Sequence, residues 1–349
     1  MQKKLTTDAD FMSRAVTLSR QGFPAPNPHV GCVIVRDGLV VGEGYHAYAG
    51  GPHAEAVALA QAADKARGAT VYVTLEPCNH FGRTRPCSEA LIEAQVARVV
   101  YAVSDPNPKA CGGGARLRSS GIEAVHLATR AASLANEQFL AAYDRQRAFV
   151  CLKAAIGLDG RSALQNGESR WITGERARRA GHRLRAEMGC VLVGAGTLIK
   201  DDPFLTARIP GVRNQPEKLV LLDRPLESRS WRASNIQAIW WDGKSWLITS
   251  LADASPREGG EIEAIAAELF KAGISGVLVE GGAKTHSRFL ANGCVDRIEL
   301  FIAPRLLGHG PNWCTYDAFQ PLSEAPHFEI SKIRKLGEDV QVTACPRRA

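Results

Sequence analysis

Short apolar runs separated by helix-like stretches make up the first 147 residues of the chain. Two runs, 32–36 and 39–44, are joined by Asp37-Gly38, the strongest short signal for a β-hairpin. Three more apolar runs predict strands at 69–75, 97–103 and 122–127. Helices are predicted at 8–21, at 53–66, from about residue 87, after the Gly-rich loop 111–114, and through about Tyr143. Strands that alternate with helices after one hairpin predict a three-layer α/β sandwich.

Residues 144–151 mark a boundary, because a charged helix end gives way there to a new apolar strand. We therefore expect one domain over residues 1–147 and a second over 148–349, and the chain is long enough for two hydrophobic cores. In the second half, the run 276–280 and Gly281-Gly282 precede a polar helical stretch. This pattern predicts a buried strand, a tight turn and a helix.

One histidine and two cysteines between residues 53 and 87 form a candidate metal site. His53, Cys78 and Cys87 supply an imidazole and two thiolates, which suit tetrahedral zinc with a fourth position open for water. Glu55 would lie beside the metal without binding it and could carry protons. This set is typical of zinc deaminases, although eight residues separate the cysteines where nucleic-acid deaminases have two. The alternative is three unrelated buried residues.

Composition narrows the class of protein. No run approaches the roughly 18 apolar residues of a membrane span, and the N-terminus lacks the apolar core of a signal peptide. The nine cysteines are scattered as reduced thiols would be, so we expect a cytoplasmic protein without disulfides. A net charge of +7 is compatible with binding nucleic acid or phosphorylated small molecules. The basic cluster 176–185 suits a helix, on which most arginines would face solvent.

Several motifs of the first half occur together in one known family. They are Pro26-Asn-Pro-His-Val-Gly-Cys-Val33, His53-Ala-Glu55, Thr74-Leu-Glu-Pro-Cys78, Gly82-Arg-Thr84 and Asp105-Pro-Asn-Pro108. The first half thus resembles the deaminase half of the bifunctional riboflavin-biosynthesis family RibD, in which the longer cysteine spacing is usual. The resemblance implies a cytidine-deaminase-like three-layer sandwich and substrate contacts by Asn27, His46 and Arg83. The loop 110–114 departs from the family pattern.

The second half resembles the reductase half of the same family. The matching motifs include Gly157-Leu-Asp-Gly-Arg161, Val193-Gly-Ala-Gly-Thr197, Glu280-Gly-Gly282 and Ala303-Pro-Arg-Leu-Leu-Gly308. The resemblance implies a dihydrofolate-reductase-like α/β domain that uses NADPH. The implied substrate contacts are Ser169, Arg185, Leu205, Arg208 and Glu280. The implied cofactor contacts are Lys153, Ala155, Trp171, Thr197, Asp201, Gly281, Gly282, Ala283, Lys284, Thr285, His286, Ser287 and Arg288.

The residues themselves leave parts of this second site open. A Gly281-Gly282 turn lets phosphate approach backbone N–H groups at a helix N-terminus, but alone it is more often only a tight turn. Trp171 is either a core residue or a contact of the cofactor. Lys153, Asp201 and Glu280 could bind the ribose and organise proton transfer, and the sequence does not decide among them.

The leading hypothesis is an enzyme with zinc and NADPH as cofactors and small phosphoribosylaminopyrimidines as substrates. The resemblance implies hydrolytic deamination of 2,5-diamino-6-(5-phosphoribosylamino)pyrimidin-4(3H)-one, then reduction of the ribosyl group of 5-amino-6-(5-phosphoribosylamino)uracil to ribityl. It also implies a homodimer or homotetramer, and no nucleic acid or membrane is expected as a partner. One alternative is a nucleic-acid-editing deaminase with a basic RNA-binding appendage, and another is a regulatory module that has lost one activity.

The enzyme hypothesis and the nucleic-acid hypothesis make different predictions for the basic segment 176–185. In a helix that starts after Thr173-Gly174, Arg178 and Arg185 share a face, while other arginines of 176–185 turn elsewhere. Among the arginines of this segment, the resemblance implies a substrate contact for Arg185 alone, and a guanidinium group is suited to a ribose 5-phosphate.

Overall fold

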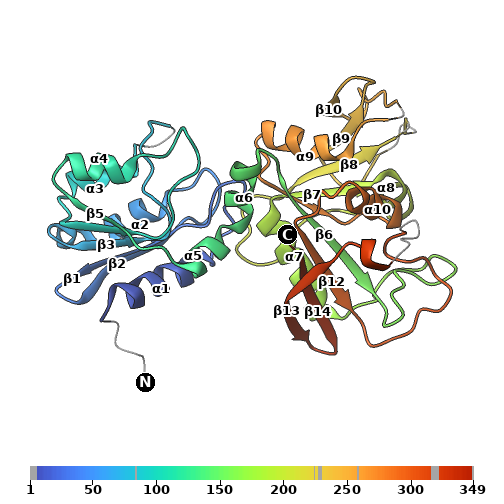
Figure 1. The fold of residues 1–349 in the computed structure, drawn as a ribbon, viewed down its shortest axis with the longest axis horizontal. Coiled ribbons are helices and arrows are strands. Elements are labelled where there is room, and N and C mark those ends of the chain that lie inside the picture. The colour runs from blue at the N-terminus through green and yellow to red at the C-terminus, as the bar shows by residue number, and fades with distance from the viewer. Residues whose placement is uncertain are drawn as a thin grey trace. The chain divides into compact units, whose positions relative to one another are not determined.

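A computed structural model describes residues 6–82, 85–223, 225–226, 230–257, 259–315 and 322–347. The chain forms two compact units, each with its own sheet (Figure 1). The first unit comprises Met1–Arg145 with Gly211–Asn214, and the second comprises Gln146–Pro210 with Gln215–Ala349. None of the described helices is long and apolar enough to cross a membrane.

The first unit is built on a five-stranded sheet of order β2-β1-β3-β4-β5. Its strands are β1 (Gly31–Arg36), β2 (Leu39–Tyr45), β3 (Thr70–Val73), β4 (Arg98–Tyr101) and β5 (Glu123–His126). The pair β1–β2 is the antiparallel hairpin predicted from Asp37-Gly38, where both residues have positive φ. β3, β4 and β5 are parallel, so their carboxyl ends meet at one edge of the sheet.

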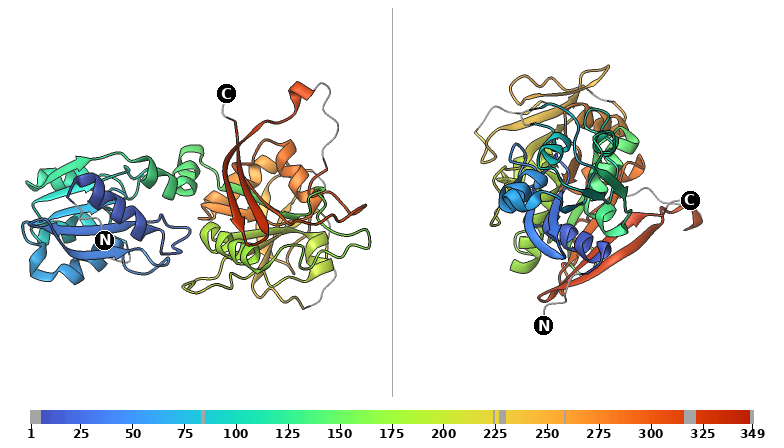
Figure 2. Two further views of the ribbon diagram at one scale, coloured as in Figure 1. Left: turned by 90° about the horizontal axis from the view of Figure 1, so that it is seen from below. Right: turned by 90° about the vertical axis from the view of Figure 1, so that its left-hand side faces the viewer.

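Helices cover both faces of this sheet, which confirms the three-layer sandwich (Figures 1 and 2). On one face lie α1 (Asp8–Ser19) and α5 (Arg130–Ala135), and α6 (Glu137–Arg145) follows α5. On the other lie α2 (Ala54–Ala62) with its 3₁₀ extension (Ala63–Ala66), α3 (Cys87–Glu93) and α4 (Gly113–Ser119). The helix predicted through Tyr143 is in fact two helices, because the chain breaks at Asn136.

The second unit is built on a nine-stranded sheet of order β10-β9-β8-β7-β11-β6-β12-β14-β13. Its strands are β6 (Phe149–Ile156), β7 (Cys190–Gly194), β8 (Glu217–Leu222), β9 (Ile236–Trp241), β10 (Trp246–Ser250), β11 (Gly276–Val279), β12 (Arg297–Ile302), β13 (Phe328–Leu336) and β14 (Asp339–Pro346). In the order of the sheet, the six strands β9, β8, β7, β11, β6 and β12 are parallel to one another. The edges are antiparallel: β10 on one side, and on the other the β14–β13 hairpin, red in Figure 2.

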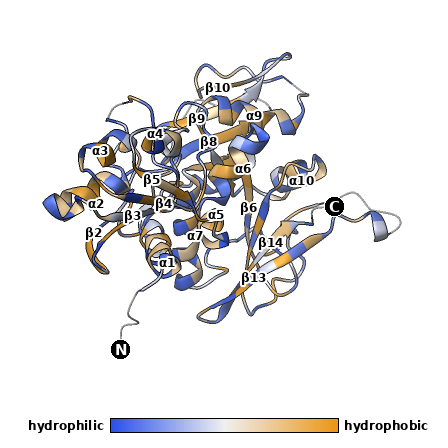
Figure 3. Cartoon of the chain, turned by 60° about the vertical axis from the view of Figure 1, so that its left-hand side comes forward, coloured by the Kyte–Doolittle hydropathy of each residue, from blue (hydrophilic) through white to orange (hydrophobic). Residues whose placement is uncertain are grey.

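Hydropathy follows position in this sheet. The central strand β8 is hydrophobic along most of its length, whereas the edge strand β13 mixes hydrophilic and hydrophobic residues and is mostly exposed (Figure 3). The helices are α7 (Glu175–Met188), α8 (Ala195–Asp201), α9 (Ile262–Lys271), α10 (Ala283–Ala291) and a 3₁₀ turn (Leu322–Glu324).

The connections of the strands β6, β7 and β11 bring two helix N-termini to the same edge of the sheet. The chain passes from β6 to β7 and returns much later to place β11 between them. The N-termini of α8 and α10 follow the neighbouring parallel strands β7 and β11 directly. A crevice at such a reversal of strand order is where ligands bind in open α/β sheets.

Candidate functional site

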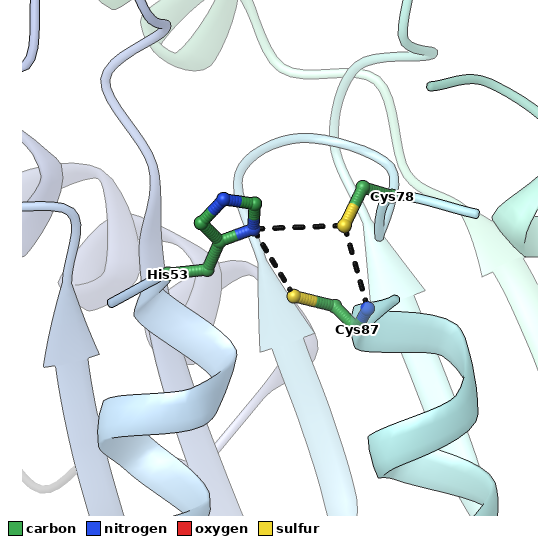
Figure 4. Close-up of side chains that lie close together, drawn as sticks. All are labelled: His53, Cys78 and Cys87. Carbon is green, nitrogen blue, oxygen red and sulfur yellow. Dashed lines mark hydrogen bonds between the residues drawn. The ribbon is translucent and has the colours of Figure 1, made fainter. Parts of the chain in front are cut away.

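Three potential metal ligands converge at the carboxyl end of β3 (Figure 4). His53 is the N-cap of α2, Cys78 follows β3, and Cys87 is the first residue of α3. The Nδ1 atom of His53 lies 3.5 Å from Sγ of Cys78 and 3.3 Å from Sγ of Cys87. The three ligand atoms all lie within 4.8 Å of one another, so these residues are not unrelated.

The donor set fits zinc. Ordinary Zn–S and Zn–N bond lengths place neighbouring ligand atoms of a tetrahedral site about 3.6 Å apart, close to the two observed distances. The pKa of the Cys78 thiol is lowered to about 4, because the thiol of Cys87 and the ring of His53 donate hydrogen bonds to its sulfur. The backbone N–H of Cys87 also donates to this sulfur, at 3.3 Å. Stabilisation of the thiolate favours metal binding, because the thiolate is the ligand.

Glu55 lies in the first turn of α2, immediately beside this cluster. Its side chain is buried, and burial together with the charge of Cys78 raises its pKa to about 7. A carboxyl group with a pKa near neutrality can both accept and return a proton. The position and burial of Glu55 therefore suit proton transfer next to a metal.

Asn27 and His46 lie at the same site. Nδ1 of His46 is 3.0 Å from the carbonyl oxygen of Pro52, and its Nε2 is 3.2 Å from Nδ2 of Asn27. The ring of His46 also packs edge-on against that of His53, with centroids 5.4 Å apart. Burial lowers the pKa of His46, so the neutral ring donates to Pro52 and accepts from the Asn27 amide. Arg83, the third predicted contact, lies outside the described residues.

Glu76 is a part of the site that reasoning from the sequence missed. Its carboxylate accepts hydrogen bonds from the backbone N–H groups of Asp105, at 3.2 Å, and Gly114, at 2.9 Å. It thereby ties the loop after β4 to the segment that carries Cys78. Gly113 packs so closely against the carbonyl of Pro77 that a β-carbon would not fit, which explains a glycine in this unusual loop. The only signal in the sequence was the Glu of Thr-Leu-Glu-Pro-Cys.

In the second unit, Arg185 of α7 and Glu280, which directly follows β11, form a bidentate ion pair. Nε of Arg185 donates to Oε1 at 2.7 Å and Nη2 donates to Oε2 at 2.8 Å, while Nη1 donates to the carbonyl of Thr206 at 2.9 Å. Lys153 lies 3.8 Å from the same carboxylate. Burial alone would raise the pKa of Glu280, but Arg185 and Lys153 hold it at about 2. Only the outer edge of the Arg185 guanidinium is left for a ligand.

Of the three polar groups that the sequence left undecided, the structure brings Lys153 and Glu280 together. Asp201 instead ends α8, where its carbonyl accepts from Arg170 at 3.5 Å. Ala155 follows Lys153 on the same face of β6, since successive side chains of a strand alternate.

The Gly281-Gly282 turn packs against the start of α8. The backbone N–H of Gly282 donates to Oγ1 of Thr197 at 3.1 Å, and a β-carbon on Gly281 would collide with Thr285. The predicted strand, turn and helix are confirmed here as β11, the Gly-Gly turn and α10. Free N–H groups at the start of α10 can bind phosphate.

The side chains of α10 divide into two groups. Ala283, Lys284 and Arg288 are half-buried or exposed, and the hydroxyl of Ser287 bonds the carbonyl of Ala283 at 2.7 Å. His286 is buried, with its ring nitrogens 3.0 Å from the carbonyl of Trp313 and 3.2 Å from that of Val279. The ring of His286 is therefore directed into the protein, so that a contact of this residue with the cofactor would be through its backbone.

The remaining predicted residues lie on loops. Trp171 is 65% exposed and has a positive φ, with the guanidinium of Arg178 4.4 Å from its ring centroid, so the core interpretation of Trp171 is wrong. Ser169 is half-buried on the same loop. The side chain of Leu205 is buried, so its contact with a ligand would be through the backbone, whereas Arg208 is exposed and donates to Oγ1 of Thr206 at 3.3 Å.

The first unit is an α/β sandwich with the ligand set of a zinc deaminase, and the second is a mixed sheet with a glycine turn at a helix N-terminus, which is compatible with a domain that binds a phosphorylated cofactor. Residues 5–103 match the cytidine and deoxycytidylate deaminase zinc-binding region, and residues 148–342 match the RibD C-terminal domain. The chain belongs to the RibD family of riboflavin biosynthesis.

Relatives match over nearly the whole chain. The RibD protein of Aquifex aeolicus is 40% identical over 96% of this chain and 97% of its own length. The structure of Acinetobacter baumannii RibD is 37% identical with a TM-score of 0.87 and covers 98% of this chain and 99% of its own. A Thermotoga maritima structure, described as a diaminohydroxyphosphoribosylaminopyrimidine deaminase/5-amino-6-(5-phosphoribosylamino)uracil reductase, is 34% identical with a TM-score of 0.84, covering 97% and 99%.

The family settles the general function. The protein is a bifunctional deaminase and reductase of the riboflavin pathway, with zinc and NADPH as its cofactors and small molecules as its substrates. The predicted fold class and enzyme class are confirmed, and the nucleic-acid-editing alternative is not favoured.

Proposed function

We propose that this chain catalyses the two reactions named for the Thermotoga maritima protein. The first unit deaminates 2,5-diamino-6-(5-phosphoribosylamino)pyrimidin-4(3H)-one, and the second reduces the ribosyl group of 5-amino-6-(5-phosphoribosylamino)uracil to ribityl. The observation that carries the proposal is the convergence of His53, Cys78 and Cys87 beside the buried Glu55.

In the first unit, His53, Cys78 and Cys87 would hold zinc, which when bound supplies an acidified water molecule as the nucleophile. Glu55 would accept a proton from the attacking water and deliver it to the departing amino group, so that ammonia would leave and a carbonyl remain. The amide of Asn27, oriented by the ring of His46, is suited to bind the edge of a pyrimidine.

In the second unit, NADPH when bound would supply the hydride. The Gly281-Gly282 turn and the start of α10 would hold its phosphates, with Thr197 fixing the turn. Trp171 offers an exposed aromatic face to the cofactor. Lys153, held by Glu280, is the ammonium group that can donate the proton needed when the ring-opened ribose is reduced.

The internal pairing of Arg185 changes its proposed role. Nε and Nη2 of Arg185 already donate to Glu280, so the main role of this guanidinium is to hold that carboxylate in place. It can contact a phosphate only with the N–H groups that point away from Glu280. The exposed Arg208 is the better placed of the two for direct contact with the 5-phosphate. Cytoplasmic location and a homodimer or homotetramer stay predictions.

The decisive experiment gives purified protein the diaminopyrimidine with and without NADPH, and follows ammonia and NADPH oxidation separately. Ammonia should appear in both cases, and NADPH should be oxidised only after deamination has begun. If ammonia release required NADPH, or if neither product formed, the proposed pair of reactions would be wrong for this chain.

A further inference from the structure

The break between α5 and α6 falls on Asn136, whose side chain binds a segment far away in the sequence. The residue is 2% exposed. Its Oδ1 accepts from the backbone N–H of His29 at 2.8 Å, and its Nδ2 donates to the carbonyl of His29 at 3.0 Å. One amide thus satisfies both backbone groups of a residue 107 positions away, as a neighbouring strand would.

The segment held in this way, residues 27–31, includes Asn27, which lies at the deaminase site. On the other side of His29, the carbonyl of Val30 accepts from the backbone N–H of His46 at 2.9 Å. The amide of Asn27 then meets the ring of the same His46 at 3.2 Å. The Asn27 side chain therefore extends from a segment whose backbone Asn136 binds two residues away, while the backbone N–H of Asn27 itself donates to the carbonyl of Pro24 at 2.9 Å.

A second polar side chain holds the same segment. Oγ1 of Thr74, a buried residue, accepts from the backbone N–H of Gly31 at 3.1 Å. Thr74 lies just after β3, on the way to Cys78. The segment is therefore held on one side to the strand that leads to a metal ligand, and on the other to the α5–α6 junction, where Asn136 provides the attachment.

We propose that Asn136 is a positioning residue of the deaminase reaction, which acts through Asn27 and does not touch the substrate. The inference rests on the function proposed above. Loss of the amide would remove both bonds from Asn136, leaving the carbonyl of His29 with only the longer bond from Oγ1 of Thr74, at 3.4 Å, and let the segment shift. A misplacement of about 1 Å can cost up to about a hundredfold in rate.

The test compares Asn136→Ala with Asn136→Asp. The first removes both hydrogen bonds, whereas the second keeps the acceptor for the N–H of His29 but places a buried carboxylate oxygen against its carbonyl. The KM for the diaminopyrimidine should rise at least about fivefold for Ala and at least as much for Asp. Reduction of substrate that is already deaminated, and the zinc content, should be unchanged in the same preparations, which shows that the protein has folded.

A double-mutant cycle separates positioning from general stability. In an Asn27→Ala background, Asn136→Ala should raise the KM no further, because the residue through which it acts is already gone. If the two substitutions add independently, Asn136 does not act through Asn27 and the proposal is overturned.

Thr129→Ala is the matched control. Oγ1 of Thr129 caps the N-terminus of α5 by accepting from the backbone N–H of Ala132 at 3.3 Å, so its loss weakens the same helix without touching His29. It should lower the Tm and leave the KM unchanged. Equal effects of Thr129→Ala and Asn136→Ala on the KM would contradict the proposal. Failure of the wild-type protein to release ammonia would instead count against the proposed function.

Discussion

The two candidate sites are assembled in opposite ways. In the first unit, the ligand atoms of His53, Cys78 and Cys87 point at one another, and the backbone N–H of Cys87 also donates to Sγ of Cys78, so a metal is what would bind all three together. In the second, the charges of Arg185 and Glu280 already neutralise each other. The comparison shows that the first site needs a metal to bind its three ligand atoms together, whereas the buried carboxylate of the second is already paired with two cationic side chains of the protein.

Removal of zinc should produce the largest difference between the sites. We expect one zinc per chain and complete loss of ammonia release after chelation, because the nucleophile is lost with the metal. Reduction of the deaminated substrate should continue. Metal analysis, with both activities measured on the same sample, checks this. Deamination at full rate in protein that contains no zinc would remove the basis of the comparison.

Glu55→Gln should keep the zinc and lose deamination by at least about a hundredfold, the usual size of a general acid–base contribution. The amide is nearly isosteric, so the buried position stays filled while proton transfer is lost. Rates of ammonia release at matched zinc content provide the measurement. Near-normal turnover would mean that another group carries the proton.

Arg185→Ala tests the balance of the second site. It leaves the buried carboxylate of Glu280 without its main partner, which should destabilise the second unit by about 3–5 kcal/mol. The KM of the reductase step should rise by roughly tenfold to a hundredfold, while deamination barely changes. Arg183→Ala is the control, because Arg183 pairs with Glu187 on the outside of the same helix. Equal effects of the two substitutions would refute a special role for Arg185.

Acid should destabilise the second unit by protonating the carboxylate of Glu280. Its pKa falls from 4.5 to about 2 on folding, so its contribution is fully present above about pH 4.5 and is lost as the pH falls through about 2. The shift corresponds to roughly 3 kcal/mol. Thermal unfolding between pH 5 and pH 2 should show this loss, and Glu280→Gln should reduce the slope. An unchanged slope in the variant would assign the acid sensitivity to other groups.

The smallest effects are expected at the exposed arginines of α7. Arg179 pairs with Glu175 within the helix and is largely exposed, and Arg176 is also exposed. Arg176→Ala and Arg179→Ala should leave both activities near wild type. If both weakened reduction as much as Arg185→Ala, with a steep dependence on salt, the segment would act as a diffuse basic patch.

Short-range patterns predicted most of the fold and the metal cluster. The hairpin at Asp37-Gly38, the position of His53 at the start of a helix and the turn at Gly281-Gly282 depend on a few adjacent residues, and all three are found as predicted. Family resemblance supplied the long-range assignments, but not their geometry.

What the sequence did not reveal depends on contacts between distant residues. The pairing of Arg185 with Glu280 joins residues 95 apart, and the Asn136 bonds that interrupt the predicted helix join residues 107 apart. The inward turn of His286 likewise follows from the position of Val279 and Trp313, not from its neighbours in the helix. No local periodicity carries this information.

The late insertion of β11 between β6 and β7 has a consequence for synthesis on the ribosome. In the first unit, each successive strand from β3 to β5 joins the edge of a sheet that already exists, so this unit can form as it emerges. In the second, β7 can pair with β8 on one side, but the neighbour that it shares with β6 begins only at Gly276, and the other neighbour of β6 begins only at Arg297. Until then β7 has one unpaired edge and β6 has two, and the nascent chain is open to wrong pairing for most of the time that its second half takes to be made.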